Sequence, residues 1–442
     1  MLLGRAGVLD RADVLLAALR GGTGGLLWVR GEAGIGKSSV LTEIGARARR
    51  AGATVLRGTA ADEATGAPAF WLWTQVLRQA GTGDPQALVA LGGPRARRAA
   101  ELVDPDPSGD SDPQPANRFP LFDGVLAVLD GLTTEFPVVL LLDDLHWADT
   151  GSLHLVRFLL PSLAARPVLV VCGWRDHEVP IGSDRDLLAA EIAAAGESWP
   201  LAGLGPNDVA ALIAATGGQH VGPDEAAAVA GRTSGNPLFV SEMARLAAAR
   251  GAAVSEMVPE TAQGAIRRRV ARLPQPAQHV LTVAAVLGQE ASLDPVRTLA
   301  GLDPDSFVAG LDAVVASGLA RHEGDRLALS HALVRDAVYD ATPASRRREL
   351  HLEAADVPGL LPAEVAGHLL HARPLADLDR VVAATEEAAR AAHDAQAWED
   401  ATRLYRLALD LAPADDAARP RLLRGAGAAL LDAADLEAAR VL

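Results

Sequence analysis

A glycine-rich segment near the N-terminus carries residues whose types and spacing suit phosphate binding. The segment GEAGIGKSS fits the pattern GxxxxGK[ST] without a mismatch and lies between an apolar run and a helix-like run. Glycines let consecutive N–H groups converge on phosphate oxygens, and the following helix points its positive end at the same anion. Lys37 would reach the β- and γ-phosphates of ATP, and the Ser38 hydroxyl would bind Mg²⁺. The predicted nucleotide-binding loop comprises Gly31, Glu32, Ala33, Gly34, Ile35, Gly36, Lys37, Ser38 and Ser39.

The use of basic residues singles out the same segment. The chain holds 41 lysines and arginines, and Lys37 is the one lysine among them. Elsewhere the chain uses arginine for positive charge, whereas at this position it keeps a compact ammonium group that a planar guanidinium does not replace. The composition therefore indicates a specific chemical requirement at residue 37.

A second motif, PVVLLLDD at residues 137–144, supplies two adjacent carboxylates. Its aliphatic run predicts a strand buried on both faces of a parallel sheet, with the acids at its carboxyl end. Ligands of open α/β sheets bind at that edge. Asp143 can hold Mg²⁺, and Asp144 can orient or deprotonate an attacking water.

A third candidate follows the predicted strand at residues 167–173, where Arg175 stands at the strand's end. There Arg175 can either sense the γ-phosphate or form a structural ion pair with an acid such as Asp176. A last short strand is expected near residues 199–201. Five strands with intervening helices predict a three-layer, doubly wound P-loop domain over residues 1–200.

Two further segments of this domain receive separate predictions. Residues 70–73, FWLW, begin an apolar helix whose aromatic rings either fill the core or contact a ligand. Residues 104–117 are dense in Asp, Pro and Ser, and we expect a mobile loop there.

The overall composition excludes several classes of protein. The 442 residues carry a net charge of −15, which argues against broad binding to nucleic acid or to anionic membranes. A single cysteine, Cys172, excludes an intrachain disulfide and a cysteine-based zinc site. No apolar run approaches the roughly 20 residues of a membrane-spanning helix, and the N-terminus lacks a signal-peptide pattern. We therefore expect a cytoplasmic protein without a membrane partner.

The rest of the chain divides into three predicted regions. Residues 201–257 carry helical signals only and predict a helical lid over the nucleotide. Residues 258–345 combine short helices with a Gly-Asp turn that suits a small hairpin, which suggests a winged helix. Arginine runs in and beside this region can contact DNA or simply form solvated helix faces. Residues 346–442 are predicted to form a third, helical region that resembles the start of a tetratricopeptide (TPR) array.

A repeat pattern begins in this last region. Trp398, Ala401, Tyr405 and Ala408 keep the spacing of a TPR helix, and Leu436 restarts the pattern. Helix pairs of this kind need neighbours to bury their faces. Because the sequence stops within the second unit, we expect a C-terminally truncated product with an incomplete α-solenoid.

Taken together, these motifs resemble the ATPase module of the STAND class of signalling NTPases, and most of all the large ATP-binding regulators of the LuxR family related to MalT. The resemblance covers nearly the whole chain, and DDLHWAD is far more specific than a P-loop alone. The matching stretches are LLGRAG, RGEAGIGKSSVL, LLLDDLHWADTGSLHLVRFL, VVCGWRD, RTSGNPLFVSE and LSHALVRDAVYD.

The resemblance implies roles for individual residues. Pro237 matches the GxP proline that packs on adenine, and Arg175 becomes the sensor at the strand end. His331 stands where a winged-helix histidine contacts the ADP β-phosphate in related switches. SHALVRD does not reproduce the MHD triplet of those switches, so His331 can equally be a buried, hydrogen-bonded core residue. The chain also lacks the acid expected after Gly4-Arg5, and no helix-turn-helix follows the repeats.

The resemblance implies an ATP/ADP- and Mg²⁺-dependent regulatory switch with slow hydrolysis and a signalling or transcription-regulatory output. An inducer or protein would bind the C-terminal repeats, nucleotide would control self-association, and this chain would not itself bind DNA. Two alternatives remain open. A ring-forming, AAA-type remodelling ATPase would turn over fast, and a nucleotide-holding module would not turn over.

Overall fold

The computed structural model describes residues 2–61, 66–104, 118–176, 178–180, 182–254 and 262–433. In these ranges the N-terminal part is built on one parallel sheet of five strands in the order β2-β3-β4-β1-β5. The aliphatic runs predicted as strands form β3 and β4, which are buried along their whole length. The strands are β1 (Gly25–Arg30), β2 (Thr54–Thr59), β3 (Val138–Asp143), β4 (Val168–Trp174) and β5 (Glu197–Pro200).

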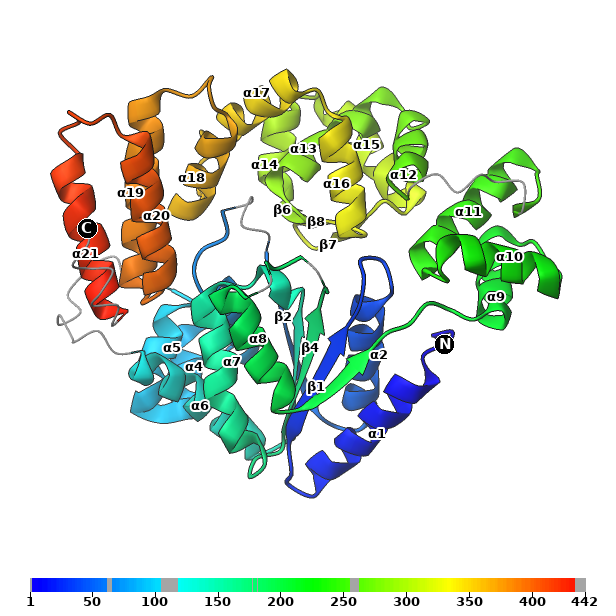
Figure 1. Ribbon diagram of the computed structural model, residues 1–442, viewed down its shortest axis with the longest axis horizontal. Coiled ribbons are helices and arrows are strands. Elements are labelled where there is room, and N and C mark those ends of the chain that lie inside the picture. The colour runs from blue at the N-terminus through cyan, green and yellow to red at the C-terminus, as the bar shows by residue number, and fades with distance from the viewer. Residues whose placement is uncertain are drawn as a thin grey trace.

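Helices cover both faces of this sheet because successive strand residues point to opposite sides. In β1, Leu27 and Val29 join the core beneath α1 (Ala6–Arg20) and α2 (Lys37–Arg50), whereas Leu26 and Trp28 join the core on the other face. That second face is covered by α3 (Trp71–Ala80), α4 (Pro85–Gly92), η2 (Gly93–Ala96), α5 (Arg97–Glu101), α6 (Phe119–Thr133), α7 (Thr150–Leu163) and α8 (Asp184–Ala194). The predicted three-layer α/β architecture is confirmed (Figure 1).

The structure tests the prediction for the aromatic segment at residues 70–73 but not the one for the loop at residues 104–117. Phe70 and Trp73 are fully buried core residues, while Trp71 is only half-buried. The predicted mobile loop falls almost entirely on residues 105–117, outside the described ranges.

A small helical unit follows the sheet, and each of its helices begins with a proline at the first position, where the missing N–H costs nothing. The unit has its own apolar core, centred on Val209, Val229 and Val240. The helices are α9 (Pro206–Gly217), α10 (Pro223–Thr233) and α11 (Pro237–Arg250).

The next unit combines helices with a three-stranded antiparallel sheet in the order β6-β8-β7. The predicted hairpin is present as β7 and β8, joined by the turn at Gly324, whose φ of 62° suits glycine. The three-residue strand β6 is too short to leave a pattern in the sequence. The elements are α12 (Ala262–Ala271), α13 (Gln275–Leu287), β6 (Glu290–Ser292), α14 (Leu293–Ala300), α15 (Pro304–Ser317), β7 (Ala320–Glu323), β8 (Arg326–Leu329), α16 (Ala332–Ala341) and α17 (Ala344–Ala354).

Stacked helices complete the chain and lie beside the sheet domain (Figure 1). Trp398, Ala401 and Tyr405, predicted from their spacing, are buried on α20, whereas the restart at Leu436 lies outside the described residues. Arg118 clamps this stack to the sheet domain, because it pairs with Glu399 and its guanidinium lies 4.5 Å from the ring centroid of Trp398. The helices are α18 (Pro362–His371), α19 (Leu378–Asp394), α20 (Trp398–Leu411) and α21 (Arg419–Asp432).

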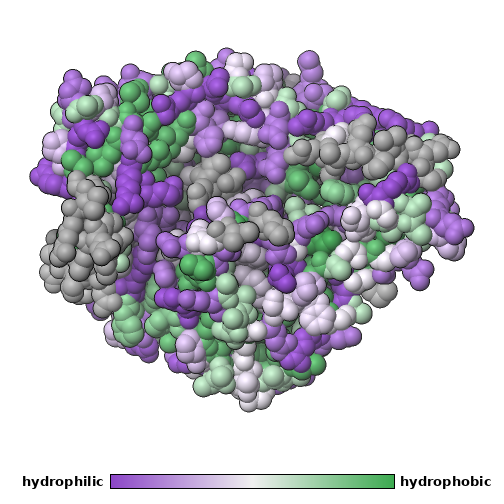
Figure 2. All heavy atoms as spheres, viewed as in Figure 1, coloured by the Kyte–Doolittle hydropathy of each residue, from purple (hydrophilic) through white to green (hydrophobic). Residues whose placement is uncertain are grey.

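Figure 2 shows hydrophilic residues interspersed with hydrophobic ones over the face in view. None of the helices within the described ranges combines the length and apolar character that crossing a bilayer requires. The predicted domain boundaries stay predictions. One continuous apolar core nevertheless joins Ile266 to Val357, so the helices on both sides of residue 345 pack together.

Candidate nucleotide site

The strand order brings the predicted site residues together. Because β4 lies between β1 and β3, the segments that follow these three strands meet at one edge of the sheet. The glycine-rich loop follows β1, the two acids end and follow β3, and Arg175 follows β4. The loop, which lies more than a hundred residues before the other two motifs, therefore meets the acids and Arg175 at one place.

The loop has the backbone geometry that a phosphate cradle requires. Gly31, Gly34 and Gly36 have φ values of 152°, 80° and 102°, a region that favours glycine. Lys37 folds back over the loop, and its Nζ donates to the carbonyl oxygens of Gly31 and Glu32 at 2.7 and 2.8 Å. The helix that follows, α2, begins without a side-chain cap, so its first N–H groups are available to an anion.

The remaining loop residues divide between core and surface. Ile35 is buried in the core beneath α1 and anchors the loop. Ser38 and Ser39 are exposed on the first turn of α2, where the Ser38 hydroxyl can reach a ligand.

The charge environment of Lys37 favours an anion. Burial, followed by the positive charge of Arg175, lowers the pKa of Lys37 to about 8. Both groups that accept hydrogen bonds from its Nζ within the described chain are backbone carbonyls. A phosphate beside this ammonium would supply the negative charge that the loop does not provide.

Asp143 is held rigidly at the end of β3. It is 2% exposed, its Oδ1 accepts from the Asp144 N–H at 3.0 Å, and its Oδ2 accepts from Arg57 Nη2 at 3.0 Å. Gly173 on the neighbouring strand leaves room for this carboxylate, since a Cβ there would lie 2.5 Å from Oδ1. A cation is therefore already the partner of this carboxylate, which fits the predicted role of Asp143 as a Mg²⁺ ligand.

Asp144 and Arg175 form an ion pair, with 3.3 Å between Asp144 Oδ1 and Arg175 Nε. Asp144 has a φ of 50°, unusual for a residue with a side chain and typical of strained functional positions. Burial and the charge of Asp143 raise the pKa of Asp144 to about 6. The structural ion pair predicted as one alternative for Arg175 is therefore present, but its acids are Asp144 and Glu178, whereas Asp176 lies 3.7 Å from Arg30.

Further contacts fix Arg175 in this position. Its Nη1 donates to Glu178 at 2.9 Å, and its guanidinium lies 4.6 Å from the ring centroid of Trp147. The last acid of DDLHWAD, Asp149, is structural, because it caps α7 by accepting from Ser152 N at 2.8 Å. Trp147 lies in the short 3-10 helix η3 (Leu145–Trp147) between these acids.

The helical unit reaches the loop through α11. Asn236 Nδ2 donates to the Ala33 carbonyl at 2.9 Å, and a Cβ on Gly34 would lie 3.1 Å from Leu238. Pro237, predicted as the adenine contact, occupies the first position of α11 directly beside Asn236. The small helical unit therefore touches the loop through both neighbours of Pro237.

His331 belongs to the unit that holds the three-stranded sheet and stands at the start of α16. It is the N-cap of α16, where its Nδ1 accepts from Leu333 N at 3.2 Å. Burial and then the positive charges of Arg175 and Lys37 lower the pKa of His331 to about 4. His331 is thus a local helix cap whose imidazole is affected by the charges of Arg175 and Lys37, and its contact with the nucleotide stays a prediction.

Three residues of this site escaped the sequence analysis. Arg5 Nη2 donates to the Ile35 carbonyl at 2.7 Å and its Nη1 to Ala202 at 3.0 Å, which ties the loop to the N-terminus and to the lid. The LLGRAG motif was a signal for Arg5, and the Asn-Pro pair was one for Asn236. No sequence pattern pointed to Arg57 as the partner of Asp143.

Known proteins share parts of this chain's sequence and fold. The family model described as an AAA ATPase domain matches residues 1–171. A STAND protein with a tetratricopeptide repeat sensor from Pyrococcus horikoshii has 14% identity and a TM-score of 0.50, and the match covers 97% of this chain. This chain spans 62% of the length of that structure.

Other solved structures are more distant. Cdc6p from Pyrobaculum aerophilum has 12% identity and a TM-score of 0.37, with 77% of this chain and 95% of that chain covered. RuvB from Thermotoga maritima has 12% identity and a TM-score of 0.32, with 77% and 96% covered. A comparison with curated proteins gives no match. Residues 1–171 thus match the AAA ATPase domain model, and the chain as a whole shares its fold with the STAND protein from Pyrococcus horikoshii.

Proposed function

We propose that this chain is an ATP-binding regulatory switch of the STAND type, in which ATP/ADP exchange and slow hydrolysis control a signalling or transcription-regulatory output. One observation carries the proposal: Asn236 of the lid contacts the phosphate loop at Ala33, and the positive charges of Arg175 and Lys37 act on His331 of the winged-helix unit. A nucleotide there would be enclosed by three units. The likeness to LuxR-family regulators is part of this proposal and rests on the sequence motifs.

The loop residues provide the binding step. Lys37 and the first N–H groups of α2 would hold the phosphates, with Ser38 and Asp143 as ligands of Mg²⁺. Bound Mg²⁺ supplies charge neutralisation of the β- and γ-phosphates. Pro237, next to the residue that contacts the loop, is positioned to pack on the adenine.

The hydrolytic residues support slow turnover. Asp144 would orient or deprotonate the attacking water, but its carboxylate is paired with Arg175. That pair must open before Asp144 can accept a proton and Arg175 can meet the γ-phosphate. Opening this pair would add a conformational step to each turnover, and such a step can be rate-limiting, which fits slow hydrolysis.

The stacked helices support a regulatory role for the C-terminal region. Their attachment to the sheet domain through Arg118 and Glu399 gives an inducer or protein bound at the repeats a direct route to the ATPase. Release of this contact would favour exchange and nucleotide-dependent self-association. The turnover rate distinguishes the alternatives, since a remodelling ATPase is fast and a nucleotide-holding module does not turn over.

The test of the switch is the substitution His331→Ala. If His331 locks the closed state through the β-phosphate of ADP, its removal costs a charge-assisted hydrogen bond of about 1.5–3 kcal/mol. ADP affinity should then fall roughly tenfold or more, and affinity for a non-hydrolysable ATP analogue should fall less. Titration with a fluorescent ADP and competition with the analogue measure both values.

The matched control for this experiment is His322→Ala, which removes an exposed histidine of the same unit. Its nucleotide affinities should equal those of the parent protein. Equal losses for ADP and the ATP analogue in His331→Ala, or no loss at all, would contradict the role of His331 as the lock.

A second prediction concerns Arg57. This side chain donates to Asp143 at 3.0 Å and is 38% exposed, so it competes with Mg²⁺ for the same carboxylate. A partly exposed ion pair is worth about 0.5–1 kcal/mol. In Arg57→Gln, the Mg²⁺ concentration needed for half-maximal binding of fluorescent ATP should therefore fall roughly two- to fivefold. Arg50→Gln, which removes an exposed arginine of α2, is the control, and an unchanged or higher Mg²⁺ requirement in Arg57→Gln would disprove the competition.

A further inference from the structure

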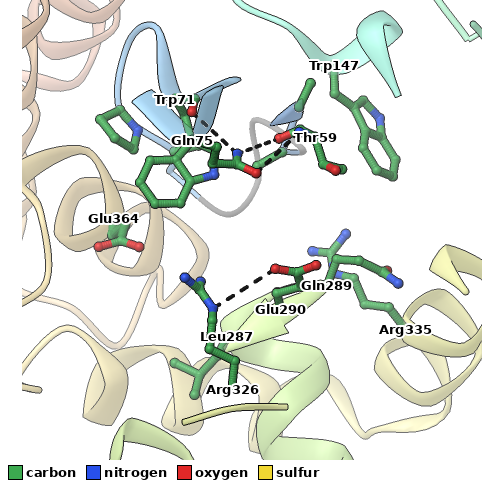
Figure 3. A pocket seen from close by; sticks show the side chains of 15 residues that line it. Thr59, Trp71, Gln75, Trp147, Leu287, Gln289, Glu290, Arg326, Arg335 and Glu364 are labelled. Atoms are coloured by element: carbon green, nitrogen blue, oxygen red, sulfur yellow. Dashed lines mark hydrogen bonds and ion pairs between the residues drawn. The ribbon is translucent and has the colours of Figure 1, made fainter. Parts of the chain in front are cut away.

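A cavity outside the nucleotide site lies between the sheet domain and the winged-helix unit. It has a volume of about 90 Å³ and is lined on one side by Thr59, Trp71 and Trp147. Figure 3 shows these side chains facing Gln289, Glu290 and Arg326 across the cavity. At roughly 10–15 Å³ per water, this space holds about six to nine water-sized groups. It therefore suits a molecule of about that many non-hydrogen atoms.

Two buried polar atoms of lining residues have no hydrogen-bond partner among the described residues. They are Gln289 Oε1 and Arg326 Nε. The Gln289 amide is fixed, because its Nε2 donates to the Leu329 carbonyl at 2.7 Å. Arg326 Nε lies 4.0 Å from Glu290 Oε2, too far for a hydrogen bond. A buried acceptor and a buried donor without partners are costly, and a ligand that supplies both groups would remove that cost.

The charges around the cavity are balanced. Two guanidinium groups, those of Arg326 and Arg335, line it together with two carboxylates, those of Glu290 and Glu364. A balanced set of this kind favours a ligand that carries both signs of charge over a simple anion. The indole rings on the sheet-domain side add apolar surface for a short side chain.

We propose that this cavity binds a free aliphatic L-amino acid. The carboxylate would accept hydrogen bonds from Arg326, the ammonium group would donate to Gln289 Oε1 beside Glu290, and the aliphatic side chain would pack against Trp71 and Trp147. Alanine, valine and leucine match the available volume. This site is separate from the phosphate loop and does not depend on ATP hydrolysis.

The position of the site links it to the nucleotide. Trp147 lines the cavity and also lies under the guanidinium of Arg175, which pairs with Asp144. An amino acid packed on Trp147 would also bridge the sheet domain and the winged-helix unit, and so favour one arrangement of the two. This regulatory consequence rests on the proposed function, whereas the binding itself does not.

Binding is tested on the full chain with L-alanine, L-valine and L-leucine at millimolar concentrations, by thermal unfolding and by calorimetric titration. At least one of them should raise the unfolding temperature and bind with measurable heat. The matched amide, such as L-leucinamide, lacks the carboxylate and should bind at least tenfold more weakly. If none of the amino acids binds, or if the amide binds equally well, the proposal is wrong.

Variants locate the site. Arg326→Gln and Gln289→Leu should each weaken binding about tenfold or more, from the loss of one hydrogen bond to a charged group. Arg297→Gln, an exposed arginine on α14, should bind like the parent. Glu290→Gln offers a third cavity variant if either of the first two fails to fold. Amino-acid affinity that survives in every folded cavity variant would place the ligand elsewhere.

A Lys37→Ala protein separates this proposal from the switch. It should bind nucleotide roughly 10- to 100-fold more weakly and keep its amino-acid affinity, because Lys37 does not line the cavity. Loss of amino-acid binding in that variant would overturn the claim that the two sites are separate. Failure of the ATPase proposal alone leaves the amino-acid result unchanged.

Discussion

In the Lys37→Ala variant, ATP and ADP affinities are expected to fall together by roughly 10- to 100-fold. The Nζ of Lys37 sits 2.7 and 2.8 Å from two loop carbonyls, at the centre of the predicted phosphate cradle. Its removal would delete a charge-assisted hydrogen bond to phosphate, worth about 1.5–3 kcal/mol. Both nucleotides carry the β-phosphate, so both should be affected. Titration with fluorescent ATP and ADP measures the two affinities.

Lys37→Arg makes this test specific. It keeps the positive charge but replaces a compact ammonium with a planar guanidinium, which cannot approach the two carbonyls and a phosphate in the same way. We therefore expect it to bind nucleotide more weakly than the parent as well. Because Lys37 bonds to the loop, circular dichroism and thermal unfolding must show that both variants remain folded. Unchanged nucleotide affinity in a folded Lys37→Ala protein would remove the basis of the site assignment.

The sheet was predictable from the sequence because its strands are local, almost purely aliphatic runs. Segments 137–144 and 167–173 became β3 and β4 with only small shifts at their ends. The hairpin at Gly324 was predictable for a similar reason, since its turn and both strands lie within a few residues. By contrast, β6 pairs with β8 across more than thirty residues and spans only three, so it left no periodic signal.

The site itself was predictable only as a set of separate motifs. Spacing predicted that Lys37, Asp143 and Arg175 would meet, because parallel strands end at a common edge. Their partners depend on tertiary packing that no local pattern reports. The sequence left open whether Arg175 senses the γ-phosphate or pairs with an acid such as Asp176, and the structure pairs it with Asp144, at the end of a different strand, and with Glu178.

The contacts between units were even harder to predict from the sequence. Asn236 was read as a helix start, which it is, but its amide also reaches Ala33 across 203 residues. The proposed amino-acid cavity depends on how the winged-helix unit packs near Trp147. Single residues of its lining, such as Gln289, have no distinctive sequence context.

The Asp144→Asn variant should separate binding from hydrolysis. Asparagine keeps the size of the side chain and removes the charge that would orient or deprotonate water, while Asp143 remains as the metal ligand. If Asp144 is the general base, turnover should fall by roughly 10²–10⁴-fold. Nucleotide affinity should change far less, because Lys37 and the α2 N-terminus are untouched. Phosphate release at saturating ATP and titration with fluorescent ATP give the two quantities.

The control for this variant is Asp176→Asn, on the same sheet edge but paired with Arg30 rather than with Arg175. It should hydrolyse ATP at the parental rate. That result would show that the loss of a carboxylate near the site does not by itself slow hydrolysis. Asp144→Asn also removes one of the two ion pairs of Arg175 and leaves the one with Glu178, so ATP can bind slightly tighter in the variant through the γ-phosphate. Hydrolysis at the parental rate in Asp144→Asn would place the base elsewhere. A parent protein that binds ATP and never releases phosphate would instead support the nucleotide-holding module, because then no residue acts as a base.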